Sequence, residues 1–284
     1  MNLQNILSEI EKKDPEVLEK LDTRRNAMKR FANVSGKVAI ASIPLALGSM
    51  FKKAYGSPTS PSDIIIDTLN FALTLEYIES NFYIQAVASG IIPAGQSLTD
   101  ITVLRDHEKT HVAFLSAAIT AAGGKPVTYT ASQFDFTAKG TFPTVFTDYG
   151  VLLAVAQTFE DTGVRAYKGQ APNLITSNDY LTAALQIHSV EARHAAHIRS
   201  MRYKLGALVP AGVTVKPWIT LNQSGIGSTA VQPSYDGEEN VTQGGVTIIG
   251  IGGNTFITAA AASEAFDEPL TKDQVTAIVT PFFA

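Results

Sequence analysis

Four long segments with helical periodicity, joined by a short, a long and a second short connection, dominate this 284-residue sequence. Apolar residues keep three- and four-residue spacing through the first segment, which starts near Ser60 and stops at Gly90. The same spacing predicts further helices over about 97–122, 143–168 and 177–205. Helices of roughly 25 to 30 residues connected in this way form a four-helix bundle with one long crossover. The sequence therefore predicts a mainly α fold.

The pattern changes after Pro210. Apolar residues between Val213 and Trp218, and again over 246–249, indicate short strands between glycine clusters. Thr271 is placed to cap a final short helix. We expect three parts, which are an N-terminal export signal or helical extension over 1–56, the bundle over 57–208, and a C-terminal extension that wraps the bundle over 209–284.

The first 56 residues have a character of their own. Arg24-Arg25 precedes a modestly apolar run over 38–50, and Ala54-Tyr55-Gly56 offers small residues for cleavage. This arrangement resembles a twin-arginine export signal, which implies recognition by the twin-arginine export machinery and a periplasmic or extracellular location, with the signal either removed or kept as a membrane anchor. Ala27 and Lys37 depart from that signal. The alternative is an N-terminal helix packed on the domain.

The composition excludes several classes of protein. Cysteine is absent, so the chain has no disulfide, no thiolate metal site and no cysteine nucleophile. A net charge of -4 offers no positive surface for nucleic acid, and no run of eighteen apolar residues is present. A hydrophobic fraction of 45% with 17% charged residues is not that of a disordered chain. Any metal ion must be held by His, Asp and Glu.

Glutamate is scarce in the four helical segments, since residues 57–208 contain only five. Two of the five begin a Glu-x-x-His pair, at Glu108 with His111 and at Glu191 with His194. Residues three apart lie on one face of a helix, so each pair can reach a single ion. Random placement of the chain's His and Glu would give about 0.2 pairs at this helical spacing. Two pairs on two different segments therefore favour a shared role over chance surface pairs.

The other two helical segments each carry a glutamate in apolar sequence. Glu76 and Glu160 would each cost several kcal/mol to bury unless they were paired, protonated or bound to a metal. Glu76 precedes the first Glu-x-x-His pair by 32 residues, and Glu160 precedes the second by 31. A tyrosine follows each of these glutamates by seven residues, at Tyr83 and Tyr167. The two halves of the bundle therefore look like copies of one helical hairpin.

A Glu from each of two helices and a Glu-x-x-His pair from each of the other two form the ligand set of ferritin-like di-iron and di-manganese proteins. More narrowly, Leu75–Glu79, Glu108–Leu115 and Val190–Ala196 resemble the bacterial ferritin-like family that also includes plant desiccation-related proteins, and Gly237–Val246 is similar too. The resemblance implies a ferritin-like four-helix bundle that holds two metal ions. The six residues that match the ligand set are Glu76, Glu108, His111, Glu160, Glu191 and His194.

The donor types suggest which metal would bind. Carboxylate oxygens with one imidazole per ion suit Fe or Mn better than zinc or calcium. Two carboxylates would bridge the ions and two would bind terminally. Tyr83 and Tyr167 either hydrogen-bond the ligating carboxylates or fill the core. Of the remaining polar residues, Glu79 is expected to be solvated or to support the ligands, and His107, His188 and His197 to be structural. Arg165 and Arg193 are expected to neutralise or orient carboxylates.

Two functions of different classes fit these residues. The first is an exported di-metal protein that acts on Fe(II), O2 or peroxide in oxidative or desiccation stress, with either a ferroxidase-like or a manganese catalase-like activity. The alternative is a stress-protective structural protein whose metal site only stabilises the bundle. The sequence leaves open the choice between Fe and Mn and the oligomeric state, a homo-oligomer included.

Overall fold

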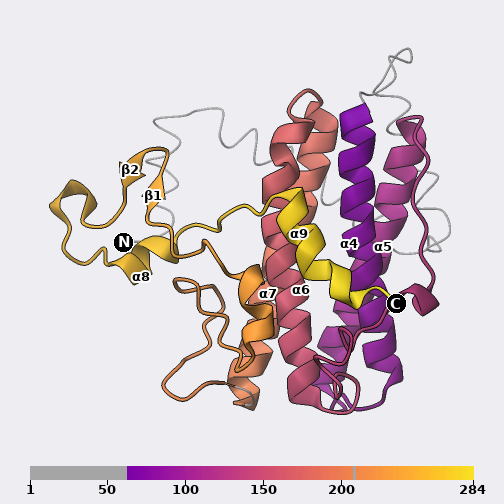
Figure 1. Ribbon diagram of the computed structural model, residues 1–284, viewed down its shortest axis with the longest axis horizontal. Helices are drawn as coiled ribbons and strands as arrows, with labels where there is room; N and C mark the ends of the chain where they lie inside the picture. Colours follow the sequence, from indigo (N-terminus) through magenta and orange to yellow (C-terminus); the bar gives the residue numbers. More distant parts are fainter. Residues whose placement is uncertain (1–62, 207–208) are drawn as a thin grey trace, which may run out of the picture. The chain divides into compact units, whose positions relative to one another are not determined.

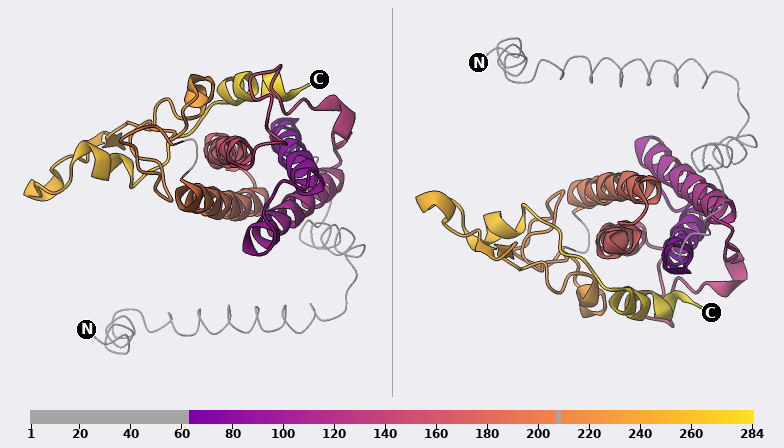
Figure 2. Two further views of the ribbon diagram at one scale, coloured as in Figure 1. Left: turned by 90° about the horizontal axis from the view of Figure 1, so that it is seen from below. Right: turned by 90° about the horizontal axis from the view of Figure 1, so that it is seen from above.

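The computed structural model describes residues 63–206 and 209–284. Four long helices form a bundle, in which α4 packs along α5 and α6 packs along α7, and the two pairs meet through α4 with α6 and α5 with α7 (Figures 1 and 2). This arrangement confirms the predicted mainly α bundle. The bundle helices and the short 3-10 segment that follows α6 are α4 (Asp63–Ala88), α5 (Gln96–Ala121), α6 (Tyr149–Gln170), η3 (Ala171–Leu174) and α7 (Asn178–Leu205).

Local sequence explains where these helices begin and end. The backbone amides of Gly150 and Val151 donate to the side chain of Asp148, so α6 begins at Tyr149 rather than near Pro143 as predicted. The prediction was wrong there because residues 143–147 form turns and supply no cap of this kind. At the same end of the bundle α7 stops at Gly206, which has a left-handed φ of 64°, as the sequence indicates.

The long crossover over 122–148 packs against the bundle through aromatic side chains. It contains η2 (Ala131–Gln133), and the buried Phe134 and Phe136 follow directly. The ring of Phe134 lies 5.4 Å from that of Phe283, and the same two residues form an isolated β-bridge. The crossover and the C-terminus therefore share one face of the core.

The segment after α7 is built from short elements. The described residues over 209–219 contain no strand, so the strand predicted at Val213 to Trp218 is wrong; Pro210, Pro217 and a positive φ at Gly212 interrupt the extended backbone there. The final helix begins after Thr271 with a capping box, as predicted. The elements are η4 (Thr229–Ser234), β1 (Thr242–Gln243), β2 (Val246–Thr247), which pairs antiparallel with β1, η5 (Ile251–Gly253), α8 (Ala259–Ser263), α9 (Lys272–Val279) and η6 (Thr280–Phe282).

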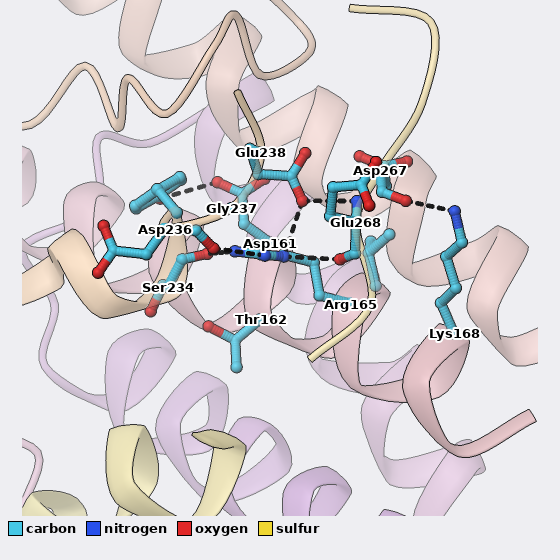
Figure 3. Close-up of polar contacts among 12 residues, drawn as sticks. Asp161, Thr162, Arg165, Lys168, Ser234, Asp236, Gly237, Glu238, Asp267 and Glu268 are labelled. Atoms are coloured by element: carbon cyan, nitrogen blue, oxygen red, sulfur yellow. Dashed lines mark hydrogen bonds and ion pairs between the residues drawn. The ribbon is translucent and has the colours of Figure 1, made fainter. Parts of the chain in front are cut away.

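One buried arginine anchors this C-terminal segment to α6 (Figure 3). Arg165 is 1% exposed and donates to the backbone carbonyls of Ser234 at 2.6 Å, Asp236 at 2.8 Å and Glu268 at 2.8 Å. Its Nε also lies 2.7 Å from Oε1 of Glu238, a carboxylate that is itself 1% exposed. Every contact therefore joins the outer face of α6 to residues far along the chain.

Two further features hold the same interface. The carbonyl of Leu270 approaches α6 so closely that a Cβ on Gly169 would lie 1.9 Å from its oxygen. The buried Asp161 accepts from Nε of Arg199 on α7 at 3.0 Å and from the hydroxyl of Tyr235 at 2.8 Å. The buried charges of Asp161 on α6 and Arg199 on α7 are thus paired with each other, and Tyr235 of the C-terminal segment adds a hydrogen bond to Asp161.

The expected export signal and domain boundary at residue 56 lie in 1–62, outside the described residues. In the part of the chain that the structure describes, no helix is long and apolar enough to cross a membrane.

Candidate metal centre

Each bundle helix contributes one carboxylate to a single point of the core. Glu76 on α4, Glu108 on α5, Glu160 on α6 and Glu191 on α7 are all fully buried. The imidazoles of two nearly buried histidines lie among them. The structure thus brings together all six residues that match the ligand set, which we call the Glu/His cluster: Glu76, Glu108, His111, Glu160, Glu191 and His194.

One end of the cluster is centred on His111. Its Nδ1 lies 3.1 Å from Oε2 of Glu76, 3.1 Å from Oε2 of Glu108 and 3.2 Å from Oε1 of Glu191. These four residues can each place one donor atom so that all four atoms lie within 4.8 Å of one another. This spacing is compatible with a single ion.

The other end is centred on His194. Its Nδ1 lies 2.8 Å from Oε1 of Glu108 and 3.3 Å from Oε2 of Glu160. Glu108, Glu160, Glu191 and His194 form a second group with donor atoms within 4.8 Å of one another. Glu108 and Glu191 belong to both groups, so the two groups of donors overlap at these two carboxylates.

Two tyrosines orient the carboxylates that are not shared. The hydroxyl of Tyr83 on α4 donates to Oε1 of Glu160 on α6, and the hydroxyl of Tyr167 on α6 donates to Oε1 of Glu76 on α4. Both tyrosines are buried. Each hairpin therefore supplies the hydrogen bond that fixes a carboxylate of the other hairpin, which leaves the second oxygen of each carboxylate facing the cluster.

Burial and mutual repulsion make the cluster bind protons. Burial raises the pKa of Glu76 to about 7 against the opposing effect of His111, and burial also raises the pKa of Glu191 well above its usual value. Burial alone would lower the pKa of His194, but the neighbouring carboxylates of Glu160, Glu108 and Glu191 together outweigh it and raise that pKa to about 11. A divalent cation that enters the cluster would take over the role of these protons.

Several donor atoms of the cluster are suited to a metal ion. They are buried, and among the described residues they have close charged neighbours but no aligned hydrogen bond. Buried polar atoms in this condition are rare unless a water or an ion completes them. Oxygen-rich donors with one imidazole per group fit a metal that prefers hard ligands. The atoms are Oε1 of Glu108, Oε2 of Glu160, Oε1 and Oε2 of Glu191, and Nδ1 of His194.

Glu79 and His107 both lie beside the cluster, which agrees with one of the two expectations for Glu79 and differs from the expectation for His107. Glu79 is 4% exposed, so it is not solvated, and a Cβ on Gly163 would lie 3.2 Å from its Oε1 and 3.3 Å from Oε2 of Glu191. His107, expected to be structural, contacts the ring of His194. Burial and the adjacent imidazole lower the pKa of His107. The four-residue spacing between His107 and the buried His111 is the sequence signal for its placement.

The other polar candidates make contacts away from the carboxylates. Nδ1 of His188 lies 3.0 Å from the carbonyl oxygen of Val164, and Nε2 of the partly exposed His197 lies 3.0 Å from Oδ2 of Asp100. Arg193 is exposed. Arg165, expected to orient carboxylates of the centre, instead binds the C-terminal segment, as described above.

The family comparison covers the same part of the chain. Residues 65–204 match the model of a protein family described as a ferritin-like domain. None of the curated proteins compared with the chain matches it. The matched range begins in α4 and ends in α7, so it contains the whole Glu/His cluster. Residues 65–204 are therefore similar to a ferritin-like domain, and the four helices of this range enclose buried acidic and histidine groups positioned for a metal site.

Proposed function

We propose that the Glu/His cluster binds two Fe or Mn ions and that the protein acts on Fe(II), O2 or peroxide. The observation that carries this proposal is the pair of overlapping donor groups, each within 4.8 Å, that share Glu108 and Glu191. Four carboxylates balance the charge of two divalent ions, so the loaded centre would be neutral in a dry core. A single ion would leave half of that charge unbalanced.

The six residues of the Glu/His cluster would form two ion positions. Each position has one carboxylate and one imidazole of its own, and the two crossed tyrosine hydrogen bonds hold the unshared carboxylates in place. When bound, Fe or Mn supplies one-electron oxidation and reduction of the substrate. The ligands of the first position are Glu76 and His111, those of the second are Glu160 and His194, and Glu108 and Glu191 lie between them.

The site proposal is tested by metal content and turnover. Metal-free protein loaded anaerobically with Fe(II) or Mn(II) should hold close to two ions per chain, and Glu76→Ala or His194→Ala should lower that content. Glu239→Ala, a substitution at an exposed carboxylate, is the matched control. Oxygen uptake and peroxide decay by the loaded protein then identify the reaction. Loading that leaves no ion bound would refute the proposal.

A structural role is the alternative, and the repulsion between the buried carboxylates favours it as a second candidate. Cations would relieve that repulsion and stabilise the bundle without any turnover. Two bound ions that raise Tm, together with no oxidation of Fe(II) and no consumption of O2 or peroxide, would support this alternative.

We also propose export through the twin-arginine machinery and a role in oxidative or desiccation stress. Arg24-Arg25 and the resemblance to desiccation-related proteins support these two points. Fractionation of cells that produce the full chain should find the protein outside the cytoplasm. The variant with Arg24→Lys and Arg25→Lys should remain inside.

A further inference from the structure

His107 lies at the solvent side of the metal centre and touches one of its imidazoles. Its side chain is exposed on α5, yet its ring meets that of His194 from α7 edge to edge, with centroids 5.2 Å apart and planes 17° apart. Nδ1 of His107 lies 3.0 Å from Nε2 of His194. This distance is that of a hydrogen bond between the two rings.

This contact determines which nitrogen of His194 can offer a lone pair to a metal ion in the cluster. His194 turns Nδ1 toward Glu108 and Glu160, at 2.8 and 3.3 Å, and turns Nε2 toward His107. A neutral imidazole that offers a lone pair at Nδ1 carries its proton at Nε2, and that N–H needs an acceptor. Nδ1 of His107 is in position to be this acceptor. Ligating histidines are generally oriented by such a partner at the second nitrogen.

The two halves of the centre differ in this respect. Nδ1 of His111 also faces the carboxylates, but among the described residues Nε2 of His111 has no comparable hydrogen-bond partner. The pseudo-symmetry of the hairpins is therefore broken at the second nitrogen of the imidazoles. Within the described part of the chain, only the half that contains Glu160 and His194 has an imidazole with a hydrogen-bond partner outside the cluster.

We propose that His107 is a positioning residue for the ion position formed by Glu160 and His194, because its Nδ1 accepts the Nε2–H of His194 and so directs the Nδ1 lone pair of His194 into the cluster. The proposal rests on the proposed function to the extent that the cluster binds metal. It adds that one ion depends on His107 and that the other, held by Glu76 and His111, does not.

Two substitutions separate the hydrogen bond from the mere presence of an aromatic ring at position 107. His107→Phe keeps an aromatic ring but has no acceptor, whereas His107→Asn places a carbonyl oxygen near the position of Nδ1. Lys109→Ala, at another exposed position of α5, is the control. Mn(II) alone is the probe, and equilibrium dialysis gives the two stepwise dissociation constants. We expect His107→Phe to weaken one ion by about 10- to 100-fold and to spare the other, and His107→Asn to retain most of the wild-type affinity.

A second readout needs no metal. Nitrogen-15 NMR of the metal-free protein should show the Nε2–H of His194 as a hydrogen-bonded resonance, which His107→Phe removes and His107→Asn keeps. This measurement tests the contact even if the wild-type chain binds no Mn(II), in which case the proposed function fails on its own. The proposal is overturned if His107→Phe leaves the His194 resonance and both dissociation constants unchanged, if both ions weaken equally, or if His107→Asn behaves like His107→Phe.

Discussion

Replacing Arg165 by methionine should loosen the C-terminal segment from α6. The guanidinium donates to three backbone carbonyls and pairs with Glu238 at 2.7 Å, and both charged side chains are 1% exposed. Methionine replaces the aliphatic part of the arginine side chain but has no donor. Removing one partner of a buried ion pair costs about 3–5 kcal/mol, because the other charge stays buried without its partner. We expect the free energy of unfolding to fall by that amount, which corresponds to a Tm lower by about 6–20 °C.

The remaining carboxylate predicts how this loss depends on pH. Burial raises the pKa of Glu238 from 4.5 to about 7 although Arg165 opposes the shift. A carboxyl with a raised folded pKa stabilises the folded state below its unfolded pKa, and this contribution is lost as pH rises through the folded pKa. Without Arg165 the folded pKa rises further. The free energy of unfolding of Arg165→Met should therefore keep falling at pH values where that of the wild type has levelled off.

Urea unfolding of the metal-free protein, followed by circular dichroism, measures both effects. The double variant Arg165→Met with Glu238→Gln should recover part of the loss, with a coupling energy of about 0.5–3 kcal/mol. Arg193→Met, at an exposed arginine, should change stability by less than about 0.5 kcal/mol. A loss below about 1 kcal/mol for Arg165→Met, or strictly additive effects in the cycle, would contradict the reasoning.

Three other perturbations have defined outcomes. Metal affinity should rise from about pH 6 to about pH 8, because an incoming ion displaces protons, including one on Glu76 with its pKa near 7. Calorimetry in buffers of different ionisation enthalpy should detect the released protons. An affinity that does not change with pH would contradict this prediction. Tyr167→Phe removes the hydroxyl that donates to Glu76 and should weaken Mn(II) binding at one position by about 10- to 100-fold in dialysis, with unchanged helix content. Gly169→Ala should destabilise by about 1–3 kcal/mol in urea unfolding, because its Cβ meets the carbonyl of Leu270, whereas Gly227→Ala meets nothing within 4 Å and should be near neutral.

Sequence patterns located helix ends where the capping chemistry is local. Gly206 ends α7 and Thr271 precedes α9, because a left-handed glycine and a capping box each act within a few residues. The start of α6 was missed because a proline at 143 looks like a helix start, while the acceptor that caps the helix is Asp148. The strand predicted between Val213 and Trp218 failed because packing and two prolines, not apolar spacing, decide that backbone.

Helical spacing predicts which side chains face the centre, but not which segments pack against the outer faces of the helices. Helical spacing places Tyr167 seven residues after Glu160, about 20° from its direction, so both face the core. Arg165 follows Glu160 by five residues and points about 140° away, which is why it meets the C-terminal segment instead of the carboxylates. The packing of the C-terminal segment on α6 is a long-range contact, which a local sequence pattern does not predict. The approach of His107 to His194 likewise depends on how α5 meets α7.

Each hairpin hydrogen-bonds a carboxylate of the other through a tyrosine, and both donor groups use carboxylates from both hairpins. Neither helical hairpin alone therefore contains all the donors of one ion position. α4 with α5 lacks Glu191, and α6 with α7 lacks Glu108. An isolated hairpin, or a bundle whose halves had docked one turn out of register, would offer too few donors to retain an ion. Only a chain whose two halves have assembled correctly would retain metal ions. A misfolded chain would bind no metal and catalyse no metal-dependent reaction.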